Sequence, residues 1–202
     1  MRDITITRQV FMFDELTPTA QATAIIKVRS ELYEWLESNQ ITNYLNGDLF
    51  EIITGNCVGE IDCEQLTKDI GLKIEWRLSH CQGDGVAIYG TLNSDDAPSL
   101  NWGDATTAIL ARNHWGNHYT HGNCIDISLI RFDDDGNEMS IVDDGTFADQ
   151  IKDICRKLER YGYQEIDNLT SEQYAVDHCR LNCGRKFNDD GTCAPSEFWA
   201  AQ

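Results

Sequence analysis

The stretch Lys73-Ile74-Glu75-Trp76-Arg77-Leu78-Ser79-His80 decides the fold, because apolar and polar residues alternate in it without interruption. Side chains of a β-strand point alternately to its two faces, so this pattern predicts a strand with one buried face. A second apolar segment, 86–92, follows after the loop 81–85, in which Gly-Asp-Gly turns the chain. We therefore expect an antiparallel hairpin at the centre of the protein.

Helical patterns lie on both sides of this hairpin. Thr17 and Pro18 are typical of a helix start, and two shorter helical patterns occupy 42–70. Thr146 and Asp149 have the spacing of a capping box, and a last helix is predicted from Thr170 to about Asn182. The first helix carries an apolar stripe at steps of three and four: Ala22, Ile25, Val28, Leu32, Trp35 and Leu36.

The remaining segments predict further strands and one short helix. Residues 4–13 are rich in β-branched and aromatic side chains, which is typical of a strand, and 104–111 predicts a short helix. Strands are also expected near 114–120 and 124–132, with an edge strand at 138–142 after a turn at Gly136 and a small terminal hairpin around 188–191. On this strand pattern one side is shared by His114, His118 and Cys124, and His121 points to the other.

Together these elements predict an α+β fold: a central antiparallel sheet of about four to five strands flanked by N-terminal and C-terminal helices. Strands and helices do not alternate as a parallel sheet would require. The length of 202 residues fits a single domain spanning 1–202, with a small C-terminal helix–hairpin appendage at 165–202.

The net charge limits the partners of the protein. The chain has 34 acidic and 16 basic residues, which gives a formal charge of −18. Such a protein repels nucleic acid and anionic membranes but can bind a basic surface, including one that normally holds DNA or RNA. No run approaches the ~18 apolar residues of a spanning helix, and the start of the chain lacks the apolar region of a signal peptide. We expect a soluble, cytoplasmic protein.

Eight cysteines are too few for a disulfide scaffold of this length and predict reduced thiols. The best metal-binding pattern is formed by His178, Cys179, Cys183 and Cys193, which supplies up to four zinc ligands. It lacks a CxxC pair, and the spacing of Cys179 and Cys183 favours buried thiols on one helix face over a zinc site. We expect no cofactor.

One constellation has the parts of a thiol enzyme. Cys81 ends the first strand of the hairpin, and Asp84 and His121 could supply an orienting carboxylate and a base. The alternative interpretation is an ordinary hairpin turn, in which Gly83, Asp84 and Gly85 serve only the backbone. The chain contains none of the motifs of P-loop enzymes, dinucleotide-binding proteins, zinc proteases or serine esterases.

The negative charge is concentrated in one stretch. Residues 133–153 contain eight acidic side chains and one basic side chain. A concentrated field of this kind attracts a basic partner, although solubility and helix capping would also explain it. The predicted partner-binding residues are Asp133, Asp134, Asp135, Glu138, Asp143 and Asp144.

Several segments, in order along most of the chain, resemble an uncharacterised family of tailed-bacteriophage proteins. They are Phe13-Asp14-Glu15-Leu16-Thr17, Leu78-Ser79-His80-Cys81-Gln82-Gly83-Asp84-Gly85, Tyr119-Thr120-His121, and Asn182 with Phe187-Asn188-Asp189-Asp190-Gly191. The Cys-Gln-Gly-Asp-Gly phrase is the most specific of them, and His80 stands where the family has tyrosine. The resemblance implies a phage origin and the cytoplasm of a bacterial host, but no established activity.

These observations favour a non-enzymatic inhibitor over an enzyme. The leading hypothesis is a phage-encoded acidic protein of the anti-CRISPR or antirestriction type, which mimics DNA and binds a basic, nucleic-acid-binding surface of a host defence complex. Two alternatives remain open: a small cysteine-dependent enzyme that uses Cys81, His121 and Asp84, and a non-catalytic virion or assembly accessory protein.

Overall fold

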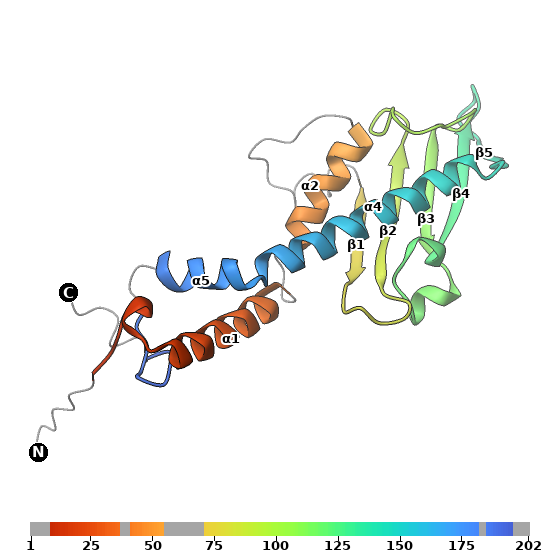
Figure 1. Cartoon of the computed structure of the whole chain (residues 1–202). Helices are drawn as coiled ribbons and strands as arrows, with labels where there is room; N and C mark the ends of the chain where they lie inside the picture. The colour runs from red at the N-terminus through yellow and green to blue at the C-terminus, as the bar shows by residue number, and fades with distance from the viewer. Residues whose placement is uncertain (1–8, 37–40, 55–70, 182–184, 196–202) are drawn as a thin grey trace, which may run out of the picture. The chain divides into compact units, whose positions relative to one another are not determined.

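The computed structural model describes residues 9–36, 41–54, 71–181 and 185–195 (Figure 1). The chain divides into two compact units, one built from 39–165 and the other from the two ends, 1–38 and 166–202. The expected appendage at 165–202 begins at this boundary, but the N-terminal helix belongs to the same unit. In the described ranges, no helix combines the length and the apolar character needed to cross a membrane.

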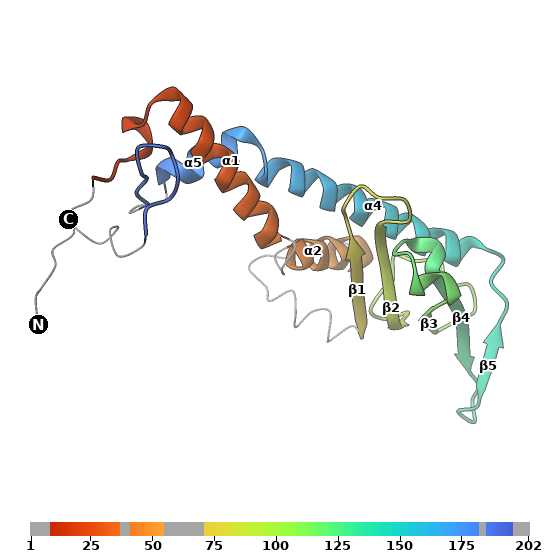
Figure 2. The same ribbon diagram turned by 90° about the horizontal axis from the view of Figure 1, so that it is seen from below.

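A five-stranded antiparallel sheet forms the centre of the 39–165 unit, with its strands side by side in chain order (Figures 1 and 2). The strands are β1 (Leu72–Arg77), β2 (Gly85–Asn93), β3 (Thr107–Arg112), β4 (Ile125–Phe132) and β5 (Glu138–Ile141). β1 and β2 form the expected hairpin, in which Leu72 lies opposite Gly90 and Arg77 opposite Gly85. The predicted α+β class and strand number are confirmed.

Two helices supply the rest of the core of this unit, α2 (Ile41–Thr54) and α4 (Thr146–Leu169). α4 crosses one face of the sheet (Figure 1). It buries an apolar stripe formed by Phe147, Ile151, Ile154, Cys155 and Leu158, and α2 buries Leu45, Leu49 and Ile53. Each large side chain removed from water stabilises the fold by about 1.5–3 kcal/mol. Ile109, Asp126 and Ser128 on β3 and β4 are exposed, as is usual for an antiparallel sheet covered on one face.

Two expectations for the middle of the chain were wrong. The segment 104–111 is not a helix, because 107–112 forms β3 and pairs with both β2 and β4. Alanine and leucine favour a helix locally, but the two neighbouring strands decide the conformation. The segment 114–120 is not a strand: a 3-10 helix covers His114–Asn117 and a second one Gly122–Cys124. The expected alternation of the histidines between two faces therefore does not exist.

The start of α4 also differs from the expected capping box. Thr146 is the first residue of the helix, and the backbone N–H groups of Phe147 and Ala148 donate to the carboxylate of Asp143 at 3.2 and 2.9 Å. The Thr146 N–H donates to Asp144 Oδ1 at 2.9 Å. Two acidic residues ahead of the helix thus satisfy its first donors and favour the positive end of its dipole.

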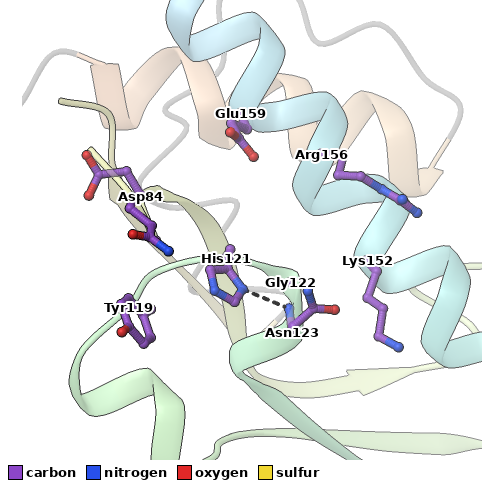
Figure 3. Close-up of a pocket in the computed structure, with 10 residues that line it drawn as sticks. Asp84, Tyr119, His121, Gly122, Asn123, Lys152, Arg156 and Glu159 are labelled. Carbon is purple, nitrogen blue, oxygen red and sulfur yellow. Dashed lines mark hydrogen bonds between the residues drawn. The ribbon is translucent and has the colours of Figure 1, made fainter. Parts of the chain in front are cut away.

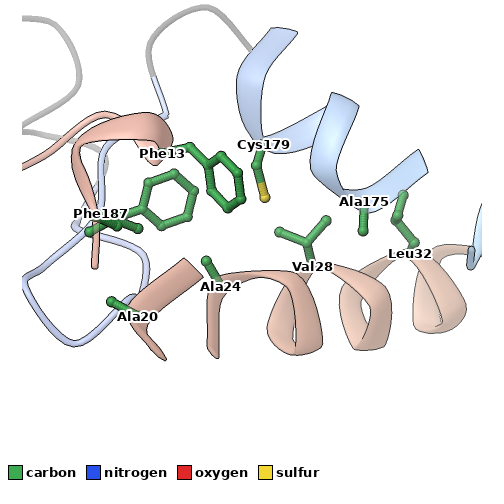
Figure 4. Packing of buried hydrophobic residues seen from close by; sticks show 9 residues of the cluster. Phe13, Ala20, Ala24, Val28, Leu32, Ala175, Cys179 and Phe187 are labelled. Carbon is green, nitrogen blue, oxygen red and sulfur yellow. The ribbon is translucent and has the colours of Figure 1, made fainter. Parts of the chain in front are cut away.

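The unit formed by the two chain ends is a helix pair closed by a small turn. α1 (Pro18–Trp35) begins as predicted, with Thr17 accepting from the Ala20 N–H, and its stripe Ala20, Ala24, Val28 and Leu32 is buried. Ala22 and Trp35, which were expected in that stripe, are exposed. α5 (Glu172–Leu181) packs on α1 through Ala175 and Cys179 (Figure 4).

Two aromatic rings close this second core. Phe13 and Phe187 meet edge to face with their centroids 6.1 Å apart. Phe187 also forms a single β-bridge to Phe11. A second bridge joins Phe187 to Cys193 across the predicted turn at 188–191. A strand was expected at 4–13, and its first part, 4–8, lies outside the described residues. Its described part is wrong, because Phe13 begins the 3-10 helix Phe13–Glu15.

Candidate functional site

A polar pocket of about 480 Å³ opens beside α4 in the 39–165 unit (Figure 3). Three segments far apart in the sequence form it: the loop after β1, the turn before β4, and one side of α4. Its lining is Gln82, Gly83, Asp84, Tyr119, His121, Gly122, Asn123, Lys152, Arg156 and Glu159. The first two segments are the Cys-Gln-Gly-Asp-Gly and Tyr-Thr-His phrases of the sequence, which this pocket brings together.

Asp84 holds the loop after β1 in place. Its Oδ2 accepts from the Ser79 N–H at 3.1 Å, the Ser79 hydroxyl at 2.6 Å and the Cys81 N–H at 2.9 Å, and its Oδ1 lies 3.3 Å from Arg77 Nε. Only 3% of its side-chain surface is exposed. Burial by itself would raise the pKa of Asp84, but the hydrogen bonds from Ser79 and Cys81 and the charge of Arg77 outweigh it, so the pKa lies below its usual value.

Glycine is required where this loop meets the turn before β4. Gly83 has a φ of 86°, and a Cβ built on it would lie 2.0 Å from Cδ1 of the Tyr119 ring. The Gly83 carbonyl accepts from the Thr120 N–H at 2.9 Å. A side chain at position 83 would therefore be strained in its backbone and would collide with the aromatic ring. The first glycine of the Cys-Gln-Gly-Asp-Gly phrase thus allows the loop after β1 to pack against the turn before β4.

His121 and Glu159 face each other across the pocket (Figure 3). His121 Nδ1 accepts from the Asn123 N–H at 3.2 Å and lies 3.5 Å from the Cys124 sulfur. Burial raises the pKa of the Glu159 carboxyl, the charge of His121 opposes this, and the charge of Asp84 adds to it. The pocket thus holds one carboxyl group with a lowered pKa and one with a raised pKa.

Lys152 and Arg156 supply positive charge on consecutive turns of α4. They also pair weakly with acidic residues on their own helix, Lys152 with Asp149 at 3.7 Å and Arg156 with Asp153 at 3.6 Å. Exposed pairs of this type contribute about 0–1 kcal/mol, so an incoming anion can compete for both cations.

The structure brings together only two of the three residues of the expected thiol enzyme site. Asp84 and His121 line the same pocket, but Cys81 does not line it and its side chain is exposed. The Cys81 thiol donates to the Ser79 carbonyl at 3.6 Å, and its backbone N–H belongs to the Asp84 network. Within the described ranges, no hydrogen bond joins Cys81 to His121. Asp84 acts here as a clamp on the loop.

Of the other described thiols, those of Cys124, Cys155 and Cys179 are buried and that of Cys193 is half-buried. Burial raises the pKa of Cys155 to about 12 and that of Cys179 to about 11, and it also raises the pKa of Cys124. In the zinc pattern, Cys179 lies in the α1–α5 core and the Cys193 sulfur accepts from Arg185 Nε at 3.1 Å. Cys183 lies outside the described residues. Among the residues that the structure does describe, no three potential ligands gather around a metal site.

The predicted partner-binding carboxylates flank β5, the edge strand of the sheet (Figure 2). Asp133, Asp134 and Asp135 form the β4–β5 turn, Glu138 begins β5, and Asp143 and Asp144 precede α4. Three of the six already accept hydrogen bonds from the backbone: Asp133 from residues of the turn, and Asp143 and Asp144 from the first turn of α4. The remaining three have no such role in the described structure.

Sequence reasoning missed the contribution of α4 to the pocket. Lys152, Arg156 and Glu159 follow each other at steps of four and three, which places them on one side of the helix. They lie next to the buried stripe of Ile151, Cys155 and Leu158, so their position at the edge of the core was a usable signal. The sequence pattern does not, however, indicate which loop these three side chains of α4 face.

Comparison with known proteins gives no match: no protein-family model, no curated protein and no solved structure matches this chain. The resemblance to a bacteriophage family therefore stays a prediction, and the functional argument rests on the geometry of the described residues.

Proposed function

We propose that the protein is an acidic inhibitor that binds a basic, nucleic-acid-binding surface of another protein. The sequence resemblance suggests a bacteriophage as its source, and its negative charge suggests a nucleic-acid-binding defence complex of the host as its target. The surface that carries this proposal consists of the six carboxylates at 133–144 and is called the acidic edge below.

The observation that carries the proposal is that six carboxylates flank β5 and that hydrogen bonds from the backbone hold three of them in place. Asp133 Oδ1 accepts from the N–H groups of Asp135 and Asn137 at 3.0 and 2.8 Å. Asp144 accepts from Thr146. Charges that are already held in place lose little conformational freedom when a partner binds, which favours affinity. Phosphates of a DNA backbone are likewise held at fixed intervals.

Hydrogen bonds also favour the ionised form of two of these carboxylates. Hydrogen bonds from the Asn137 side chain and backbone lower the pKa of Asp133. Hydrogen bonds from Thr146 lower the pKa of Asp144. Both groups therefore remain negative to a lower pH than an ordinary aspartate.

Exposed apolar side chains accompany the charges. Phe132 on β4 lies directly opposite Glu138 on β5 and therefore shares a face of the sheet with it, whereas Met139 points to the other face. Val142 follows β5 with 94% of its surface exposed. Exposed aromatic residues are enriched in protein–protein interfaces, so Phe132 beside Glu138 is suited to contact a partner. A DNA-like surface of charges alone would bind any basic protein, so the apolar residues give the proposed inhibitor a means of selecting one partner.

The test is affinity capture from bacterial lysate with the wild-type protein and two variants. The first variant, Asp134→Asn, Asp135→Asn and Glu138→Gln, removes the three charges that have no structural role. The matched control, Asp95→Asn, Asp126→Asn and Asp167→Asn, removes the same charge from exposed positions elsewhere. We expect capture of a nucleic-acid-binding protein by the wild type and the control, and a loss on the order of 100-fold in affinity for the first variant, from about 1 kcal/mol per charge. Equal binding by all three proteins would contradict the proposal.

A further inference from the structure

The pocket beside α4 has no part in the proposed inhibition, and its lining combines three kinds of recognition. It contains two cations, an exposed aromatic ring, and side chains that can read a pattern of hydrogen-bond donors and acceptors. Its volume of about 480 Å³ lies within the range of about 300–1,000 Å³ that is usual for small-molecule sites.

The cations stand at one end of the pocket. Lys152 and Arg156 are separated by one turn of α4, which is about 6 Å along the helix axis. Two positive side chains at this spacing can hold one anionic group between them, and the guanidinium of Arg156 can donate two parallel hydrogen bonds to its oxygen atoms. A phosphate monoester carries close to two negative charges, which these two residues balance.

The aromatic ring stands at the other end. Figure 3 shows Tyr119 and the two cations on opposite sides of His121. The Tyr119 ring rests on the backbone of Gly83, and 37% of the surface of this residue is exposed. The His121 ring lies nearly parallel to it, with 20° between their planes and 6.1 Å between their centroids. The rings of Trp115 and His118 lie 6.2 and 6.3 Å from it, at its edges or tilted against it. A flat, exposed ring that the backbone holds from behind is a platform on which a planar ligand stacks.

Three other side chains of the lining have hydrogen-bonding groups that the protein itself does not use. In the part of the chain that the structure describes, neither the side-chain amides of Gln82 and Asn123 nor the carboxylate of Glu159 makes an intramolecular hydrogen bond. The amides can donate and accept, and the carboxylate accepts from N–H groups. Amide and carboxylate side chains of this kind recognise the polar edges of nucleobases.

We propose that this pocket binds a nucleoside monophosphate, with the phosphate between Lys152 and Arg156, the base on Tyr119, and the polar edge of the base toward Gln82, Asn123 and Glu159. The net charge of −18 opposes a nucleic-acid polymer, which gains its affinity by neutralising many phosphates. A mononucleotide needs only the two cations in the pocket. The ligand is thus consistent with a protein that does not bind DNA.

Isothermal titration calorimetry with AMP, GMP, CMP and UMP tests the proposal, with guanosine and inorganic phosphate as the separate halves of one ligand. We expect saturable binding of at least one mononucleotide, and at least about tenfold weaker binding of the nucleoside and of phosphate alone. No saturable binding of any mononucleotide at millimolar concentration would overturn the proposal. Phosphate that binds as tightly as the best nucleotide would also overturn it, because the ring would then contribute nothing.

A pair of neighbouring residues provides a matched control. Arg156 and Lys157 are both exposed and both pair with Asp153, at 3.6 and 3.7 Å, but only Arg156 lines the pocket. Arg156→Gln should weaken nucleotide binding at least about tenfold, and Lys157→Gln by less than about twofold. Tyr119→Ala should also weaken it about tenfold or more, through lost stacking. Circular dichroism melting curves establish that each variant is folded, and equal affinities of Arg156→Gln and Lys157→Gln would refute the assignment.

Discussion

Replacing Asp84 with alanine should open the loop at 79–84 without unfolding the sheet. The carboxylate accepts three hydrogen bonds from Ser79 and Cys81 and contacts Arg77, and each bond to a charged group is worth about 1.5–3 kcal/mol where water cannot replace it. Ser79 and Cys81 are exposed, so water recovers part of this loss. We expect the substitution to destabilise the closed loop by about 2 kcal/mol. This raises the equilibrium constant for opening of the loop about 30-fold.

Hydrogen exchange at the amides of Ser79 and Cys81 measures this opening directly. In Asp84→Ala both amides should exchange about 30-fold faster, whereas Asp135→Asn, which removes a carboxylate with no hydrogen-bonding role in the described structure, should leave them unchanged. Unchanged protection in Asp84→Ala would refute the clamp that we assign to this residue.

The stabilisation of the loop by the Asp84 carboxylate should depend on pH. The folded-state pKa of Asp84 is below the ordinary value near 3.9, so the stabilisation is complete above that value and is lost as the pH falls through the lower, folded-state pKa. The difference in protection between wild type and Asp84→Ala should therefore be constant from about pH 7 to pH 5 and shrink below about pH 4. A difference that does not change in acid would contradict the role of the ionised carboxylate.

Three further substitutions or measurements probe the surrounding structure. Gly83→Ala should abolish nucleotide binding and destabilise the protein by at least about 1–2 kcal/mol in denaturant titration, because its Cβ meets the Tyr119 ring in a left-handed backbone. Asp143→Ala should lower the free energy of unfolding by about 1 kcal/mol through loss of the α4 cap, whereas Glu138→Gln should change it by less than about 0.5 kcal/mol. Iodoacetamide should label Cys81 before the buried Cys155, but no faster than an exposed cysteine in a short peptide; a rate well above the peptide would instead support a thiol enzyme.

The parts of the fold that follow a local period could be predicted from the sequence. Strict alternation at 73–80 predicted β1, and a threonine followed by proline predicted the start of α1. The segment 107–112 could not be assigned in this way, because its short apolar run fits a helix or a strand and pairing with β2 and β4 decides between them. At 114–124 the side chains of Asn113 and His121 cap 3-10 turns, which alternation does not reveal.

The candidate site was predictable only in part, for a similar reason. Asp84 and His121 were predicted as members of one constellation, and both line one pocket together with Gly83, which was expected only to serve the turn. The contribution of α4 depends on which side of the helix faces which loop, and this is a property of the packed unit. Cys81 was placed with Asp84 because the two are close in sequence, but the turn directs the thiol away from the pocket lining.

The proposal that the acidic edge mimics nucleic acid is tested most directly by competition on the captured partner. A labelled DNA duplex is bound to that partner, and the protein is titrated into the complex at about 0.05 M and at about 0.5 M salt, where the screening length is several-fold shorter. We predict that the protein displaces the DNA at low salt and that displacement weakens steeply at high salt. A ternary complex in which DNA and the protein bind together, or displacement that does not depend on salt, would contradict the proposal.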